Sequence, residues 1–321
     1  MTDGALIHRL DDTIDAILKR ADATAALGDP ELAPLARVAV ELRHYPRPEF
    51  KAGLRARLER RTAMTALVTP RIREGFTTIT PYVRVRDARL VDFLRDVFGG
   101  EETYSARGSG GGMHREVRVG NSTIMIGEGG DDAVVPIMPA AFHVYVEDVG
   151  ATFERALAAG ATSLGAPADR PYGERAGFVR DPFGNHWYIA TQHGRSYVPE
   201  GLRTVTPFVH ARGAASYIEF LKRAFGAVEE GRHDAEGRVV YARLRIGNAA
   251  LELGEADRVE PMPGSFYLYV GDPDGVYAQA LAAGATSLWP PADQPFGERM
   301  GGVVDAMGAR WFIARPAQDE G

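Results

Sequence analysis

Polar and aromatic side chains alternate with other residues in two short stretches of the chain, 80–84 and 206–210. Successive residues of a β-strand point to opposite faces of the sheet, so residues two apart share a face. The shared side chains combine hydroxyl, ring and cationic groups, which together can hold a small polar or aromatic molecule. We therefore expect one inner, ligand-binding face to carry Thr80, Tyr82 and Arg84, and Thr206, Phe208 and His210.

Histidines recur in two further alternating stretches. His114 is two residues before Glu116, and His186 is two residues before Tyr188. An imidazole changes its charge near neutral pH, so His114 could act as a general base or as a metal ligand together with His186. The alternative is that His114 is a hydrogen-bonded surface residue. The same inner parity is predicted for two more pairs, Tyr241 with Arg243 and Arg310 with Phe312.

The tripeptide Gly-Glu-Arg occurs twice, at 173–175 and at 297–299. Both occurrences lie between predicted strands, and loops often carry binding residues. Arg175 and Arg299 could anchor an acidic group of a ligand through paired hydrogen bonds. In the alternative, the Glu and the Arg of each loop pair with each other and pin the turn.

An internal repeat organises all these positions. The octapeptide Leu-Ala-Ala-Gly-Ala-Thr-Ser-Leu stands at 157–164 and returns letter for letter at 281–288. Matching segments continue on both sides of it, which indicates one domain present twice. We predict the first copy at 76–194 and the second at 202–316.

Each copy contains the same order of periodicities twice. An alternating stretch at 78–85 leads into helical spacing of apolar residues at 90–98, and Gly99-Gly100 ends the helix. Three short strand-like runs follow, and the scheme restarts near 141. The predicted fold class is α+β, built from four modules of one strand, one helix and three strands (βαβββ). One module leaves a sheet face uncovered, so the two modules of a copy should combine into a half-open barrel.

Residues 1–65 are predicted to form a small all-helical segment, joined to the repeats by a linker at 66–75. The helix expected at 49–64 is basic and could contact nucleic acid, but Glu49 and Glu59 interrupt the positive charge and no aromatic residues interleave. A solvated helix face is the better interpretation. Three short helices bury little surface alone, so we expect them to pack on the repeats or on a second chain.

Composition excludes several classes of protein. The 321 residues are 45% hydrophobic and 25% charged, typical of a globular chain with room for two or three domains. The net charge of -6 offers no general attraction to nucleic acid or to an anionic membrane. Cysteine is absent, which excludes disulfides and thiolate sites and fits a cytoplasmic location. No apolar run is long enough to span a bilayer, and the start does not resemble a secretory signal.

The order of modules, with Asp181-Pro-Phe-Gly184 before the last strand of the first copy, resembles the vicinal oxygen chelate superfamily. This superfamily includes glyoxalase I, extradiol dioxygenases, and fosfomycin- and bleomycin-resistance proteins. Thr80-Pro81-Tyr82 and the Gly-Glu-Arg loops are similar to its PhnB-like subgroup. The resemblance covers both copies and implies tandem glyoxalase-like domains. It also places Arg84 where glyoxalase-like enzymes carry a substrate-binding arginine.

The enzymes of this superfamily hold a divalent metal that chelates two substrate oxygens. Counted from Asp87, Asp148 and the Asp-Pro turn, the resemblance assigns four ligand positions to each copy. They are Thr80, Met125, Phe142 and Tyr188 in the first copy, and Thr206, Glu252, Phe266 and Phe312 in the second. Only Glu252 is a competent ligand, so we expect the usual metal site to be lost and no cofactor to be required. His143 then falls on the opposite face, toward the helices, as a structural residue; a shift of one residue would place it at a ligand position.

Three functional hypotheses follow. The first is a metal-independent protein of the bleomycin-resistance kind, which sequesters or transforms an aromatic or amphipathic small molecule. The second is a metal-dependent lyase, isomerase or dioxygenase-like enzyme with replaced ligands. The third is a pair of closed structural modules whose N-terminal helices recruit a partner. The replaced ligands of the second hypothesis are His114, His186, His210 and Glu252.

The two copies retain different polar residues. The first keeps Arg84 and His186, and the second keeps His210 and Glu252. This difference predicts one working site and one scaffold. Since two copies stand in for the two subunits of a single-domain relative, we expect either a pseudo-dimeric monomer or a homodimer, with no nucleic-acid or membrane partner.

Overall fold

The computed structural model describes residues 72, 75–86, 88–108, 112–129, 136–194, 196–257 and 259–315. The predicted N-terminal helices (1–65) and most of the predicted linker (66–75) lie outside the described residues. Within the described ranges no helix is both long and apolar enough to cross a membrane.

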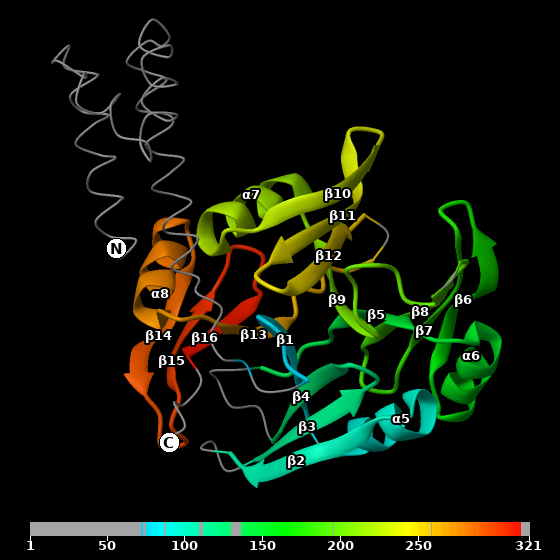
Figure 1. Ribbon diagram of the computed structural model, residues 1–321, viewed down its shortest axis with the longest axis horizontal. Helices are drawn as coiled ribbons and strands as arrows, with labels where there is room; N and C mark the ends of the chain where they lie inside the picture. Colours follow the sequence, from blue (N-terminus) through cyan, green and yellow to red (C-terminus); the bar gives the residue numbers. More distant parts are fainter. Residues whose placement is uncertain are drawn as a thin grey trace, which may run out of the picture. The chain divides into compact units, whose positions relative to one another are not determined.

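The described residues form four modules, each of one strand, one helix and three strands, in the predicted order (Figure 1). Module 1 contains β1 (Ile79–Val85), α5 (Arg89–Phe98), β2 (Glu101–Arg107), β3 (Met113–Val119) and β4 (Ser122–Glu128). Module 2 contains β5 (Ala141–Tyr145), α6 (Val149–Ala158), β6 (Thr162–Arg170), β7 (Glu174–Arg180) and β8 (His186–Gln192). Module 3 contains β9 (Val205–Ala211), α7 (Ala214–Phe225), β10 (Val228–Ala235), β11 (Arg238–Ile246) and β12 (Ala249–Glu255). Module 4 contains β13 (Ser265–Tyr269), α8 (Pro273–Ala282), β14 (Thr286–Asp293), β15 (Arg299–Val304) and β16 (Arg310–Arg315).

The modules combine in pairs into two eight-stranded sheets. One sheet has the order β14-β15-β16-β13-β1-β4-β3-β2 and the other β10-β11-β12-β9-β5-β8-β7-β6. Both sheets keep two edge strands, in agreement with the expected α+β fold of half-open barrels. The pairing partners differ from the expectation: module 1 joins module 4, and module 2 joins module 3. Each sheet therefore takes one module from each copy.

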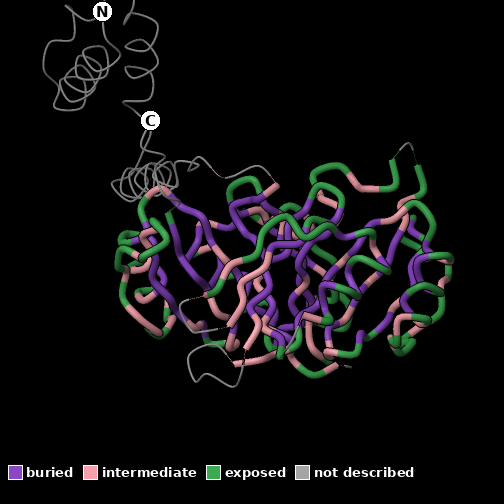
Figure 2. The backbone as a smooth tube through the Cα atoms, turned by 90° about the horizontal axis from the view of Figure 1, so that it is seen from below, coloured by how far each residue is buried: buried purple, intermediate pink, exposed green. Residues whose placement is uncertain are grey.

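The helices pack differently from the sheets, because they meet within a copy. Helix α5 contacts α6, and α7 contacts α8. One large hydrophobic core is drawn almost entirely from the first copy and another almost entirely from the second. Figure 2 shows the buried residues concentrated along the inner strands, with exposed residues mainly at the edges and turns. Each copy thus has its own core on the helix side. The opposite faces of the sheets, which no described helix covers, are shared between the copies; they are called helix-free below.

Two equivalent contacts join the first strand of each copy to a hairpin of the other copy. The Asn121 side-chain oxygen accepts from the Thr204 amide at 2.9 Å, and the Asn248 oxygen accepts from the Thr78 amide at 2.8 Å. Gly120 precedes Asn121 with a φ of 56°, and a Cβ there would lie 2.3 Å from the Thr204 hydroxyl. Only glycine satisfies both constraints. The cavity between these contacts measures about 30 Å³, room for about one water molecule and not for an organic ligand.

Candidate ligand-binding site

The helix-free face of the sheet formed by modules 2 and 3 is called here the histidine face. On β9 the predicted alternation holds: Phe208 and His210 contact Tyr188 on this face, and their neighbours Val209 and Ala211 belong to the helix-side core. The face combines ionisable groups from both copies with aromatic rings. Its principal residues are His143, Tyr145, Glu174, Phe178, His186, Tyr188, Thr206, Phe208, His210, Tyr241, Arg243 and Glu252.

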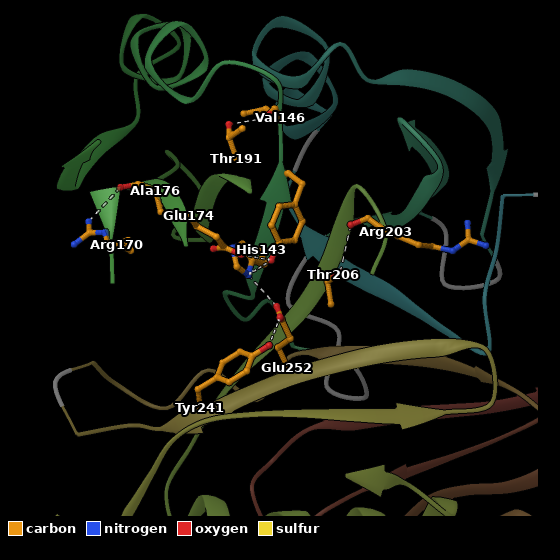
Figure 3. Close-up of polar contacts among 11 residues, drawn as sticks. His143, Val146, Arg170, Glu174, Ala176, Thr191, Arg203, Thr206, Tyr241 and Glu252 are labelled. Carbon is orange, nitrogen blue, oxygen red and sulfur yellow. Dashed lines mark hydrogen bonds and ion pairs between the residues drawn. The ribbon is translucent and has the colours of Figure 1, made fainter. Parts of the chain in front are cut away.

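His143 lies between two carboxylates at the centre of this face (Figure 3). Its Nδ1 is 3.0 Å from Oε2 of Glu252, and its Nε2 is 3.6 Å from Oε2 of Glu174. The Tyr241 hydroxyl donates to Glu252 at 2.6 Å, and the Tyr145 hydroxyl donates to Glu174 at 3.1 Å. The Tyr145 ring also stacks on the His143 ring, with centroids 4.4 Å apart. Five side chains from β5, β7, β11 and β12 therefore form one connected polar network.

The network keeps its histidine protonated. Burial alone would lower the pKa of His143, but the charge and hydrogen bond of Glu252, together with the charge of Glu174, outweigh burial and raise this pKa to about 9. Burial, with the charges of the same two glutamates, raises the pKa of Tyr145 and of Tyr241, so both stay protonated as donors. Glu252 has no exposed surface. At neutral pH the network thus holds an imidazolium between two carboxylates.

The expected position of His143 was wrong. The sequence placed it toward the helices and put Phe142 at the ligand position, yet Phe142 packs in the helix-side core against Trp187, with ring centroids 4.6 Å apart. The second copy shows the same one-residue shift, because Phe266 packs against Trp311 and Tyr267 faces the helix-free side. Phe142 and Phe266 are therefore not lining residues of either site.

A second polar group on the histidine face consists of neutral histidines. The Tyr188 hydroxyl makes a short hydrogen bond with Nε2 of His210, and the rings of His186 and His210 lie 6.3 Å apart. Burial, with His186 nearby, lowers the pKa of His210 to about 4. Burial, with Arg180 nearby, also lowers the pKa of His186. These two imidazoles are uncharged at neutral pH, in contrast to His143.

The helix-free face of the sheet formed by modules 1 and 4 is called here the aromatic face. Phe312 lies at its centre, with ring centroids 5.3 Å from Tyr82, 5.3 Å from Tyr267 and 5.7 Å from Trp289. Phe76, Met125, Tyr269 and Met300 complete this apolar cluster. Thr80 is buried and its hydroxyl donates to the Thr77 carbonyl. Tyr82 and Phe312 point to the helix-free side, as predicted, but their rings pack mainly on each other.

Polar residues of module 1 flank this aromatic cluster. Nε2 of His114 is 3.5 Å from Oε1 of the buried Glu116, and its ring is stacked 6.3 Å from that of Tyr82. Arg84 hydrogen-bonds the Tyr82 hydroxyl. His114 and His186 stand on different sheets, so the expected pairing of these two histidines in one metal site was wrong. Arg84 and His186 are likewise on different faces, although both belong to the first copy.

The first Gly-Glu-Arg segment places its charged residues on opposite sides of the strand. Glu174 is buried in the histidine network, whereas Arg175 pairs with Asp169 at 3.3 Å on the surface. Arg299 pairs with Asp274 at 2.6 Å and with Asp293 at 3.2 Å. The expected Glu–Arg pair was wrong in the first loop, where Glu174 and Arg175 have separate partners. Sequence analysis therefore missed the role of Glu174, together with those of His143 and Tyr145.

The donors on the histidine face do not fit the divalent-metal centre that the resemblance implies. With the corrected register, the four ligand positions there hold His143, Tyr188, Thr206 and Glu252, of which His143 and Glu252 are competent. Glu174 is a third donor, but it faces the other ring nitrogen of His143, so one ion cannot contact all three groups. No cluster of three or more His, Asp or Glu suited to a metal occurs among the residues that the structure describes. On the aromatic face the four equivalent positions hold Thr80, Met125, Tyr267 and Phe312.

Comparisons with known proteins agree with this architecture. A model of the Glyoxalase/Bleomycin resistance protein/Dioxygenase superfamily matches residues 79–189. An uncharacterized protein of Mycobacterium bovis is 35% identical over 122 residues, which cover 35% of this chain and 80% of that protein. CFP32 of Mycobacterium bovis, named as a candidate glyoxylase, is 26% identical over 193 residues, which cover 57% of this chain and 72% of that protein.

Solved structures show the same fold. Glyoxalase I from Zea mays is similar with a TM-score of 0.59 and 15% identity, over 76% of this chain and 92% of that chain. A candidate dioxygenase from Bacillus subtilis gives a TM-score of 0.51 and 14% identity, over 76% of this chain and 86% of that chain. At these identities the likeness concerns the fold alone. The two-sheet architecture, the family model and the relatives together show that the chain belongs to the Glyoxalase/Bleomycin resistance protein/Dioxygenase superfamily.

Proposed function

We propose that the histidine face binds a small aromatic or amphipathic molecule without a divalent metal, to sequester or to transform it. The observation that carries this proposal is the buried Glu252–His143–Glu174 network, surrounded by rings. Buried charges are costly to maintain, and perturbed ionisable groups on a helix-free sheet face are typical of functional sites. Tyr188 and Phe208, with ring centroids 5.3 Å apart, offer stacking surfaces beside the network.

The aromatic face supports the same proposal by contrast. Its equivalent positions carry rings and thioethers that pack on one another around Phe312, which is 3% exposed. A face filled by its own side chains leaves little apolar surface for a ligand. We therefore assign binding to the histidine face and a scaffold role to the aromatic face.

A thermal-shift screen of aromatic and amphipathic compounds tests the proposal. We expect hits to raise the melting temperature by about 3 °C or more, equally with a chelator and with added Mn²⁺, Ni²⁺ or Zn²⁺. Glu252→Gln should weaken these hits, and Met125→Leu, on the aromatic face, should leave them unchanged. Hits that vanish with chelator, or that depend on Met125 and not on Glu252, would contradict the proposal.

A metal-dependent lyase or isomerase is the second candidate function. It is favoured by His143 and Glu252, which occupy two of the four positions that hold metal ligands in the superfamily. It also agrees with the similarity to a candidate glyoxylase. Elemental analysis of the purified protein separates the two candidates: a stoichiometric metal that chelator removes together with activity would favour the enzyme.

The remaining proposals concern the oligomeric state, the location and the subgroup of the protein. One chain supplies all four modules, and therefore both helix-free faces, without a second subunit. We infer a monomer in solution, which light scattering coupled to gel filtration would test. A cytoplasmic location and the PhnB-like affiliation remain expectations from the cysteine-free sequence and its motifs.

A further inference from the structure

Glu174 has an unused acceptor in the histidine face. The residue is 8% exposed, and its Oε1 accepts a hydrogen bond from Tyr145 at 3.1 Å. Its Oε2 is buried and accepts no hydrogen bond from any residue that the structure describes. The nearest cationic nitrogen is Nε2 of His143, at 3.6 Å, beyond hydrogen-bond distance. A buried carboxylate oxygen normally has a donor, so this position is suited to a donor from a ligand.

The charges of the network leave a negative excess beside that oxygen. Two carboxylates, Glu174 and Glu252, face one imidazolium, His143. Both oxygens of Glu252 are used, one by Tyr241 and one by His143. Uncompensated negative charge away from water is stabilised by a cation that also donates hydrogen bonds.

Neither arginine near this face donates a hydrogen bond to Glu174. Arg170 stands opposite Glu174 in the β6–β7 pair, and its guanidinium lies over the Phe178 ring, 4.7 Å from its centroid. One terminal nitrogen of Arg170 donates to the Ala176 carbonyl, and its buried Nε makes no hydrogen bond with the described residues. Arg243, whose position pairs with Glu252 across the strands, has an ion pair with Glu230 at 3.3 Å. Neither guanidinium donates a hydrogen bond to Oε2 of Glu174, so neither supplies the donor that this oxygen lacks.

We propose that the ligand of the histidine face carries a protonated amine or a guanidinium group, which donates to Oε2 of Glu174. Tyr172, in the turn just before β7, presents a ring that is 66% exposed two residues from Glu174. Such a ring can cover a bound organic cation by a cation–π contact. This inference rests on the proposed function and names the chemical class of its ligand.

Three matched probes test the charge requirement: 2-naphthylmethylammonium, 2-naphthylmethanol and 2-naphthoate, titrated calorimetrically at pH 7. We expect the ammonium to bind about tenfold more tightly than the alcohol, a difference of roughly 1.4 kcal/mol, and the carboxylate to bind most weakly. Glu174→Gln should bring the ammonium to within about twofold of the alcohol. A melting temperature within about 5 °C of wild type shows that the variant is folded.

Glu298→Gln is the matched control, because Glu298 holds the same place in the second Gly-Glu-Arg segment, beside Tyr267 instead of a histidine. It should keep the tenfold preference. Equal binding of ammonium and alcohol by the wild-type protein, or a preference that survives Glu174→Gln, would overturn the ligand class and leave the proposed function standing. Failure of all three probes to bind would overturn both.

Discussion

The histidine face and the aromatic face are built from equivalent positions of the two copies, yet they differ in almost every chemical property. Strand register places the residues of the two faces in matching pairs. At three of these pairs the histidine face carries an ionisable or hydroxylated residue where the aromatic face carries an aromatic ring or a thioether. The three decisive exchanges are His143 for Tyr267, Glu252 for Met125 and Tyr188 for Phe312.

The helix side of both copies shows no such divergence. In each copy a buried aspartate accepts a hydrogen bond from the indole of a buried tryptophan at 2.9 Å, Asp181 from Trp187 and Asp305 from Trp311. The same aspartates also accept backbone amides of their turns. The scaffold is thus maintained on the helix side, and chemistry varies on the helix-free side.

The largest effect on stability is expected when Glu252 is replaced by methionine, the residue at the equivalent position of the aromatic face. Glu252→Met removes the closest counter-charge of His143 and the acceptor of the Tyr241 hydroxyl. Because it breaks a buried ion pair, we expect the free energy of unfolding to fall by about 3 to 5 kcal/mol in urea denaturation.

A double variant sharpens this test. Adding His143→Tyr to Glu252→Met reproduces the aromatic-face pair and removes the stranded imidazolium. It should recover about 1 to 3 kcal/mol relative to the sum of the single effects. A single Glu252→Met variant within about 1 kcal/mol of wild type would contradict the pairing.

The next effect is a loss of stability at alkaline pH that belongs to the histidine face alone. Folding raises the pKa of His143 from 6.5 to about 9, so its contribution is fully present below pH 6.5 and is lost as the pH rises through 9. The shift corresponds to about 3 kcal/mol. Denaturation curves from pH 6.5 to 9.5 should show this fall in wild type and not in His143→Gln. A parallel fall in both proteins would exclude His143 as its source.

His210 should act on the acid side, in the opposite direction. Its folded pKa of about 4 lies below the ordinary value of 6.5, so its neutral form stabilises the fold above pH 6.5. This stability is lost as the pH falls toward 4, by about 2 to 3 kcal/mol. His210→Phe should flatten this part of the stability profile, with carboxylate titration common to both proteins as the background. An unchanged profile would mean that His210 titrates normally.

The smallest effect is expected for Tyr188→Phe, which copies Phe312 onto the histidine face. The variant loses the hydrogen bond to His210 but keeps the ring contacts with Phe178 and Phe208. We expect a loss of about 1 kcal/mol in urea denaturation. A loss above about 3 kcal/mol would point to a wider rearrangement than one missing hydrogen bond.

The sequence predicts the modules well because each has a complete local signature. The stretch 206–210 was placed correctly, since its alternate residues Val209 and Ala211 are apolar and pack in the core. The short strand β5 lacks this contrast. Four of its five residues are buried, so both faces of the strand are covered. Alternation between polar and apolar residues therefore cannot fix its register. A one-residue error there concealed His143.

The pairing of modules could not be predicted from the repeat. Strands β1 and β9 both contain Thr-Pro near their start, and on chemical grounds either strand could pair with β5 or with β13. The choice depends on packing between copies, including the contacts of Thr204 at Gly120 and of Thr78 at Gly247. Glu252 and His143 belong to different copies, so without knowledge of that pairing their contact has no signal in either copy alone.

A crystal structure grown with 2-naphthylmethylammonium tests the central claim most directly. We expect ligand density on the histidine face, with the ammonium nitrogen near Oε2 of Glu174, rings against Tyr188 or Phe208, and His143 still in contact with Glu252. A metal ion bound by His143 and Glu252, or ligand density confined to the aromatic face, would contradict the account.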